Sequence, residues 1–250
     1  MSRISGAKVA IKADEVAAFF ERRAEKFDAE NPLCAVLYQD HAPQIAQHRD
    51  DYERKRILPL LNLTGTERVL DIGCGIGRWA TSLHDRISKY KGIDASGQLI
   101  DIAKAYCPYA NVHFEALGTA ELENGWFAEN GLFDRVIFAG ILIYINDEEI
   151  KPLLSVVSNH LAEHGIVYLR EPMGVLTRLT LSGHWSEELQ SKYSAIYRTP
   201  QELLGYLRHA FPTPEFEISS FEPLFEDAKL NNRAETTQMF CLIKKIGASS

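Results

Sequence analysis

Between residues 67 and 172 the sequence alternates between short apolar segments and longer amphipathic ones, and this alternation limits the possible folds more than any other feature. The apolar segments are rich in valine and isoleucine, and they predict strands at 68–72, 90–93, 112–115, 134–139 and 165–170. The segments between them have helical spacing and predict helices at 77–86, 96–106 and 147–161. Strands that alternate with helices indicate an α/β fold, in which helices cover both faces of a mostly parallel sheet.

The first 62 residues predict a helical cap over this sheet. Apolar residues at helical spacing indicate two helices, at 14–27 and 43–61. The second helix carries basic residues that alternate with acids, which indicates a solvated face; the basic residues are Arg49, Arg54, Lys55 and Arg56. We therefore expect a cap over residues 1–62 and a sheet domain over residues 63–250.

The last third of the chain predicts an insertion and a closing pair of strands. The segment 173–198 is polar with scattered aromatic residues, and we expect a lid-like insertion there, after the fifth strand. A helix is predicted at 199–210, with Thr199 as its N-cap. Two strand-like segments follow, at 215–221 and 238–244, and they are expected to pair as the closing, antiparallel part of the sheet.

Composition excludes several classes of protein. The net charge of −7 over 250 residues argues against nucleic acid as a partner, because nucleic-acid-binding proteins usually carry a basic surface. No apolar stretch approaches the roughly 20 residues of a membrane span, so no membrane partner is expected. The four cysteines form no CxxC pair, which indicates neither a disulfide framework nor a metal site. A reducing cytoplasm is the expected location, and the oligomeric state is left open.

A glycine-rich turn follows the first strand of the alternation. In VLDIGCGIG, Asp71 ends the strand, and Gly73, Gly75 and Gly77 follow at every second position, with Cys74 as a small apolar residue between them. Glycine lets the backbone approach a ligand closely, and the amides at the start of the next helix can receive a polar group. A dinucleotide loop would have GxGxxG spacing instead. The carboxylate of Asp71 would repel a phosphate but suits a cationic amino group.

A second acid, Asp94, ends the second strand, 21 residues after Gly73. At this place a carboxylate can accept hydrogen bonds from both hydroxyls of a ribose. After the third strand comes Gly118-Thr119-Ala120. Together with the glycine loop, these residues resemble the motifs of the class I S-adenosylmethionine-dependent methyltransferases over about residues 67 to 172.

The resemblance implies a Rossmann-like, seven-stranded sheet and S-adenosylmethionine as the cofactor. In that family the acid and glycine loop hold the methionine part, and the second acid holds the ribose. Thr119 stands where many members carry an acid that contacts the adenine amine. The cofactor-binding residues implied are Asp71, Gly73, Cys74, Gly75, Gly77, Asp94, Ala95, Thr119, Ala120 and Gly140.

Methyl transfer from a sulfonium is an in-line displacement, which depends on orientation and on exclusion of water more than on a covalent nucleophile. A general base matters only for some acceptors. By residue type and place in the predicted fold, the candidates for a catalytic role are His184, Glu171 and Tyr144. The residues expected to bind the substrate are Tyr38, Ile141, Arg170, Trp185, Tyr197 and Arg198.

The leading interpretation is therefore a methyltransferase acting on an oxygen or nitrogen atom of a small molecule. An enzyme of the same fold that transfers or cyclises the aminobutyryl chain and releases methylthioadenosine is the first alternative. A non-catalytic protein that binds the cofactor is the second, and a nicotinamide cofactor is a remote third. DNA N-methyltransferases often show an (Asn/Asp)-Pro-Pro-aromatic signature after the fourth strand, where this chain has Gly-Ile-Leu-Ile-Tyr.

Overall fold

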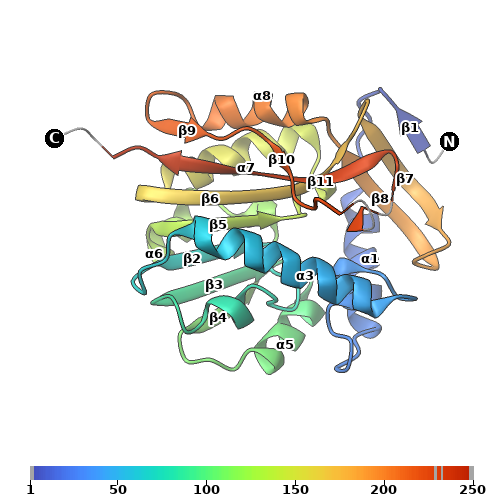
Figure 1. Cartoon of the computed structure of the whole chain (residues 1–250), viewed down its shortest axis with the longest axis horizontal. Helices are drawn as coiled ribbons and strands as arrows, with labels where there is room; N and C mark the ends of the chain where they lie inside the picture. Colours follow the sequence, from blue (N-terminus) through green and yellow to red (C-terminus); the bar gives the residue numbers. More distant parts are fainter. Residues whose placement is uncertain (1–2, 228–229, 232, 248–250) are drawn as a thin grey trace.

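The computed structural model describes residues 3–227, 230–231 and 233–247. Its centre is a sheet with five parallel strands in the order β6-β5-β2-β3-β4 (Figure 1). Their bounds are β2 Arg68–Ile72, β3 Lys89–Asp94, β4 Val112–Ala116, β5 Phe133–Ala139 and β6 Leu161–Gly174. All five lie where the sequence predicts strands, so the expected α/β fold with a largely parallel sheet is confirmed.

An antiparallel strand, β11 (Thr236–Lys245), closes this sheet next to β6. Two short strands, β9 (Phe216–Ile218) and β10 (Glu222–Pro223), also pair with β11. Within the part of the chain that the structure describes, the sheet thus has eight strands where seven were expected, the extra one being the two-residue β10. The expected antiparallel closing pair is present as β9 and β11.

Helices cover both faces of the sheet, because residues along each strand point alternately to opposite sides. Leu70 faces a core built with the helices α6 Asn124–Asn130, α7 Asp147–Asn159 and α8 Pro200–Ala210. Its neighbour Val69 faces a core built with α3 Pro43–Ile57, the 3₁₀ turn η1 Leu58–Leu61 and α4 Ala80–Leu83. Among the described residues, no helix is long and apolar enough to cross a membrane.

Capping residues mark the start of two helices. Thr199 caps α8 as predicted, because its side chain accepts a hydrogen bond from the amide of Glu202. The carboxylate of Glu202 in turn accepts a hydrogen bond from the amide of Thr199. Ser96 caps α5 (Gly97–Tyr106) in a similar way. The helix expected at 77–86 is shorter than predicted, since only Ala80–Leu83 is helical. The residues before this helix belong to the turn around Gly77, which has a φ of +76°.

The first part of the chain contains α1 (Ala13–Glu25), α2 (Cys34–Leu37) and α3. The helix α1 packs against α5 and against a hairpin strand described below, whereas α3 lies across the front of the sheet (Figure 1). Ile57 and Leu61, at the end of this region, are fully buried in the core of the sheet. The segment before residue 62 therefore does two things: it covers one end of the sheet and completes its core.

The predicted insertion is a β-hairpin made of β7 (Leu179–Ser186) and β8 (Ser191–Tyr197). With β1 (Arg3–Ser5) these strands form a separate three-stranded antiparallel sheet. The central strand β6 continues to Gly174, so the hairpin begins later than residue 173. The reason is that β11 pairs with β6 along its length, up to the pair Thr236–Gly174.

Candidate active site

A cavity of about 420 Å³ lies at the carboxyl ends of the parallel strands. Its floor is formed by the turns that follow β2, β3, β4 and β5, and by the end of β6. Its walls come from α1, from the link between α2 and α3, from the hairpin, and from the start of β11. Ligands of open parallel sheets bind at this edge, and the volume falls within the roughly 300–1,000 Å³ of small-molecule sites.

The glycine loop requires glycine for its backbone conformation. Gly73, Gly75 and Gly77 have φ values of +74°, +55° and +76°, a region that side chains rarely allow. The amide nitrogen of Gly73 donates to the carbonyl oxygen of Ile93 at 2.8 Å, which ties the loop to the end of β3. A Cβ atom on Gly75 would lie 2.6 Å from Cγ1 of Val36, so α2 packs directly on the loop.

Asp71 is buried at the end of β2, where its carboxylate accepts a hydrogen bond from the hydroxyl of Tyr90. Burial raises the pKa of Asp71 to about 7, although the Tyr90 hydrogen bond and the charge of Arg78 act in the opposite direction. A cation placed beside a buried carboxyl of this kind strongly stabilises its ionised form. It therefore fits the role of partner to an amino group.

Asp94 connects the glycine loop to the start of α5, with one carboxylate oxygen directed to each. Oδ2 accepts a hydrogen bond from the amide of Gly75 at 3.0 Å, and Oδ1 accepts one from the amide of Ser96 at 2.9 Å. Burial raises the pKa of Asp94, and these two hydrogen bonds lower it. An ionised carboxylate has about four acceptor positions, so both oxygens can accept further hydrogen bonds from a ligand.

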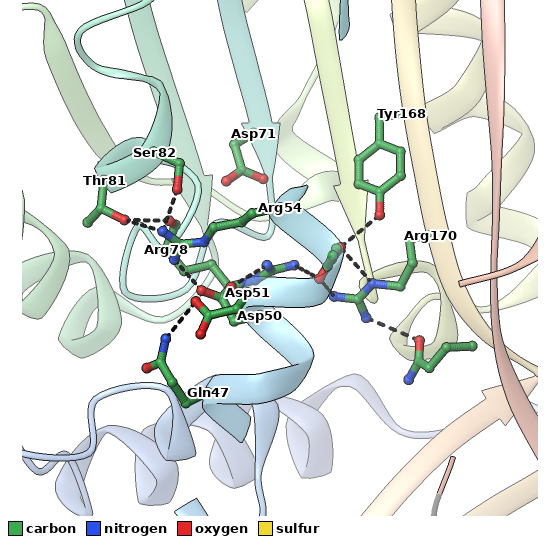
Figure 2. A network of polar contacts seen from close by, with 12 residues as sticks. Gln47, Asp50, Asp51, Arg54, Asp71, Arg78, Thr81, Ser82, Tyr168 and Arg170 are labelled. Carbon is green, nitrogen blue, oxygen red and sulfur yellow. Dashed lines mark hydrogen bonds and ion pairs between the residues drawn. The ribbon is translucent and has the colours of Figure 1, made fainter. Parts of the chain in front are cut away.

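A buried ionic network lies beside the cavity and joins α3 to the glycine loop and to β6 (Figure 2). Arg78, the residue after Gly77, contacts Asp50 and Glu53 of α3, both at 2.9 Å. Glu53 also contacts Arg170 at 3.2 Å and accepts a hydrogen bond from the hydroxyl of Tyr168 at 2.8 Å. These charges hold the pKa of Glu53 at about 2, against the effect of burial, which raises it.

The predicted solvated face of α3 is therefore wrong in part. Asp50 and Glu53 are only 1% and 2% exposed. Arg54 also turns inward, to Asp50 at 2.5 Å and to the hydroxyl groups of Thr81 and Ser82. Buried charges are tolerated when they are paired, and here three elements supply the partners.

Most of the residues expected to bind ligands line the cavity. Of the cofactor set, all but Gly77 do so; the lining residues are Asp71, Gly73, Cys74, Gly75, Asp94, Ala95, Thr119, Ala120 and Gly140. Of the substrate and catalytic set, Tyr38, Ile141, Tyr144, Arg170 and Tyr197 line it. Gly77 shapes the loop from below, where a Cβ atom would lie 2.7 Å from the ring of Phe114.

Glu171 and Arg198 lie outside the cavity lining, and the structure gives both a positioning role. The carboxylate of Glu171 accepts hydrogen bonds from the amides of Leu142 at 2.9 Å and Ile143 at 3.3 Å. Arg198 donates to the carbonyl oxygens of Leu142 at 2.8 Å and Ile145 at 2.7 Å. Both residues therefore fix the 3₁₀ turn η3 (Leu142–Tyr144). Burial raises the pKa of Glu171 to about 7, but its oxygens face the backbone.

His184 and Trp185 also lie away from the cavity lining. They belong to β7, where they pair with Tyr193 and Lys192 of β8, and Trp185 is 49% exposed. The geometry gives no support to His184 as a general base or to Trp185 as a substrate contact.

Several cavity residues were not predicted from the sequence; they are Phe20, Arg49, Arg78, Glu188, Arg233 and Gln238. One signal was available. Asp50 and Glu53 share a helix face with Ala46 and Ile57, at positions i+4, i+7 and i+11 from Ala46. Acids on an otherwise apolar face indicate buried pairing and would have directed attention to α3.

Comparison with known proteins defines the class first. Residues 69–165 match a family model described as a methyltransferase domain. The resemblance to the class I S-adenosylmethionine-dependent methyltransferases that the sequence predicts is confirmed by this match over residues 69–165 and by the Rossmann-like fold.

Particular relatives are more distant. Phosphoethanolamine N-methyltransferase 1 of Caenorhabditis elegans is 25% identical over 166 residues, which is 66% of this chain and 32% of that protein. The chain thus spans about a third of the length of the curated relative that it matches.

Two solved structures share the fold over almost the whole chain. Phosphoethanolamine N-methyltransferase 1 of Haemonchus contortus, in complex with phosphoethanolamine and S-adenosylhomocysteine, has a TM-score of 0.69 at 18% identity and covers 95% of this chain and 50% of its own. The [4+2]-cyclase SpnF has a TM-score of 0.67 at 16% identity and covers 98% of this chain and 100% of its own. The first contains S-adenosylhomocysteine, the demethylated form of the cofactor, which agrees with the S-adenosylmethionine predicted from the sequence. The second shows that the fold alone does not fix the reaction.

Proposed function

We propose that this protein is an S-adenosylmethionine-dependent methyltransferase that acts on a nitrogen or oxygen atom of a small molecule. One observation carries the proposal: a single cavity joins the acid and glycine loop at one end to a wall of tyrosines and arginines at the other. The first end has the groups that the cofactor needs. The second end has hydrogen-bonding and aromatic side chains suited to a small polar acceptor.

Each part of the cofactor has a residue that would hold it. Asp71 would pair with the amino group, and Asp94 would accept hydrogen bonds from the ribose hydroxyls. Thr119 would lie beside the adenine. Arg49 would hold the carboxylate: it lines the cavity and, within residues 3–227, 230–231 and 233–247, it has no acidic partner, its Nε donating to the carbonyl oxygen of Leu230.

The cofactor supplies a methyl group on a sulfonium, and the chain's own residues orient the acceptor and exclude water. Phe20, Tyr38, Tyr144 and Tyr193 form an aromatic wall that removes the acceptor from solvent. Burial raises the pKa of the Tyr144 and Tyr193 hydroxyls well above the usual value, so both are neutral at pH 7. They therefore donate and accept hydrogen bonds but do not act as bases. An amine that enters unprotonated needs no base.

The reaction is tested by incubating the protein with S-adenosylmethionine and candidate amines and alcohols, and by identifying the nucleoside product. S-adenosylhomocysteine that forms only with an acceptor supports methyl transfer. Methylthioadenosine formed without an acceptor would replace the proposal by aminobutyryl chemistry. No binding of S-adenosylmethionine in calorimetry would exclude both.

Asp94→Ala is expected to weaken the binding of S-adenosylhomocysteine by about 10- to 100-fold. A hydrogen bond to a charged group contributes about 1.5–3 kcal/mol, and the variant also releases the Gly75 amide. Calorimetric titration measures the change. Asp101→Asn, on the exposed side of α5, is the matched control and should leave the affinity unchanged. Equal affinity for Asp94→Ala and the native protein would refute the ribose role.

A further inference from the structure

Four tyrosine hydroxyls form one hydrogen-bonded chain along the wall of the cavity. The hydroxyl of Tyr38 contacts that of Tyr144, and Tyr144 contacts Tyr193 at 3.0 Å. Tyr197 donates to Tyr193 at 3.3 Å, and Nη1 of Arg233 donates to Tyr197 at 3.0 Å. All five side chains line the cavity, although they come from four different parts of the chain. The methyltransferase family model ends at residue 165 and covers only one of these parts, the turn η3 with Tyr144.

The arginine at one end fixes the direction of the hydrogen bonds. A guanidinium group donates only, so the Tyr197 oxygen accepts from Arg233 and its proton goes to Tyr193. Tyr193 then donates to Tyr144, and Tyr144 to Tyr38. The proton of the Tyr38 hydroxyl is left over, since the described residues offer it no acceptor besides the chain. Hydrogen bonds aligned in this way polarise one another, which makes Tyr38 a stronger donor.

Because the hydrogen bonds point in this direction, the tyrosine hydroxyls cannot carry a proton out of the cavity. A proton that entered at Tyr38 would have to leave at Arg233, and a guanidinium cannot accept it. The chain is therefore a fixed row of donors, which would favour an atom that only accepts hydrogen bonds.

Along this wall of the cavity, the arginines outnumber the acids that form ion pairs with them. Five arginines lie in or directly behind the wall, and three acids pair with them. The arginines are Arg49, Arg54, Arg78, Arg170 and Arg233, and the acids are Asp50, Glu53 and Glu188. Glu188 is 3.6 Å from Arg233 and also accepts a hydrogen bond from Gln39. If the cofactor carboxylate neutralises Arg49, the other four arginines share three acids, which leaves this group with one positive charge in excess.

The backbone that carries Tyr38 is held in an uncommon conformation. Tyr38 and Gln39 have successive φ values of +64° and +69°. Arg23 stabilises this turn, because its guanidinium donates to the carbonyl oxygens of Cys34 and Ala35 and pairs with Asp40 at 2.6 Å. A non-glycine residue with a positive φ costs conformational free energy, so two in succession are stable only where other contacts hold the backbone. Such strained turns are common at ligand sites.

We propose that the acceptor carries an anionic oxygen group, a phosphate or a carboxylate, which is bound at this end of the cavity by Arg233 and by the donor row that ends at Tyr38. This inference rests on the proposed function, because it names the class of acceptor for the same site.

The test titrates inorganic phosphate and, separately, acetate into the protein saturated with S-adenosylhomocysteine, and into the protein alone. We expect at least one anion to bind, and Arg233→Met to weaken it by about tenfold or more. Tyr38→Phe, which keeps the ring, should weaken it several-fold. Arg86→Met is the matched control, since Arg86 is exposed and contacts only Asp85 among the described side chains. Tighter binding of phosphate or of acetate identifies which group the acceptor carries.

Two results would overturn the inference: neither anion binds, or both bind equally well to the native protein and to Arg233→Met. The affinity for S-adenosylhomocysteine is measured in parallel for every variant. If the native protein does not bind S-adenosylhomocysteine, the proposed function is refuted. If it binds S-adenosylhomocysteine but neither anion, only the anionic acceptor is refuted. Circular dichroism of each variant confirms that it is folded, and Tyr38→Phe keeps the test decisive if Arg233→Met does not fold.

Discussion

Replacing Glu53 with glutamine is expected to lower the free energy of unfolding by about 3–5 kcal/mol. The variant keeps the shape of the side chain but leaves Arg78 and Arg170 without their shared buried counter-charge. The shift in the pKa of Glu53, from 4.5 to about 2, gives a similar figure of about 3 kcal/mol. Urea or guanidinium denaturation at pH 7 measures the loss.

The pH dependence provides a second check. Because folding lowers the pKa of Glu53, its contribution is complete above pH 4.5 and is lost as the pH falls towards 2. The difference in the free energy of unfolding between the native protein and Glu53→Gln should therefore become smaller below pH 4.5. Glu222→Gln removes the exposed pair with Arg56 and should change stability by less than about 1 kcal/mol. A loss that small for Glu53→Gln would show that the network does not stabilise the fold.

The affinity for S-adenosylhomocysteine is expected to fall about tenfold for each pH unit below pH 7. Burial raises the pKa of Asp71 to about 7 in the free protein, so at lower pH the carboxyl is mostly protonated. It must lose this proton before it can pair with the amino group of the ligand, and that cost appears as weaker binding. At pH 5 the loss amounts to roughly 100-fold. Calorimetric titration between pH 5 and pH 8 measures it.

Two variants connect this dependence to Asp71. Asp71→Asn should bind weakly at every pH and lose most of the dependence. Tyr90→Phe removes the hydrogen bond that lowers the pKa of Asp71, so the midpoint should move to higher pH. An affinity of the native protein that stays constant from pH 5 to pH 8 would contradict the assignment of Asp71 to the amino group.

Features encoded by local sequence were predicted well. The strand Arg68–Ile72 and the N-cap Thr199 agree with the structure, because hydrophobic runs and capping residues act within a few positions. The glycine loop with Asp71 and Asp94 also follows from spacing along two neighbouring strands. These residues line the end of the cavity that we propose for the cofactor.

The end of the cavity that we propose for the acceptor was predicted only in part from the sequence. Tyr38, Tyr193 and Arg233 meet only because α2, the hairpin and the segment before β11 converge in space. His184 was favoured by residue type alone, and the register of the hairpin places it outside the cavity lining. Glu53 was missed because an acid on a basic helix normally faces water, and here pairing with distant arginines makes burial favourable.

The position of α1 has a consequence for the order of events in turnover. This one helix packs on α5, which follows Asp94, and also on β8, which carries Tyr193 and Tyr197. Its own residues Val16, Phe20 and Glu21 line the cavity between those two contacts. Any displacement of α1 would therefore uncover both ends of the cavity together. Under the proposed function, cofactor exchange and product departure would then depend on the same movement of α1.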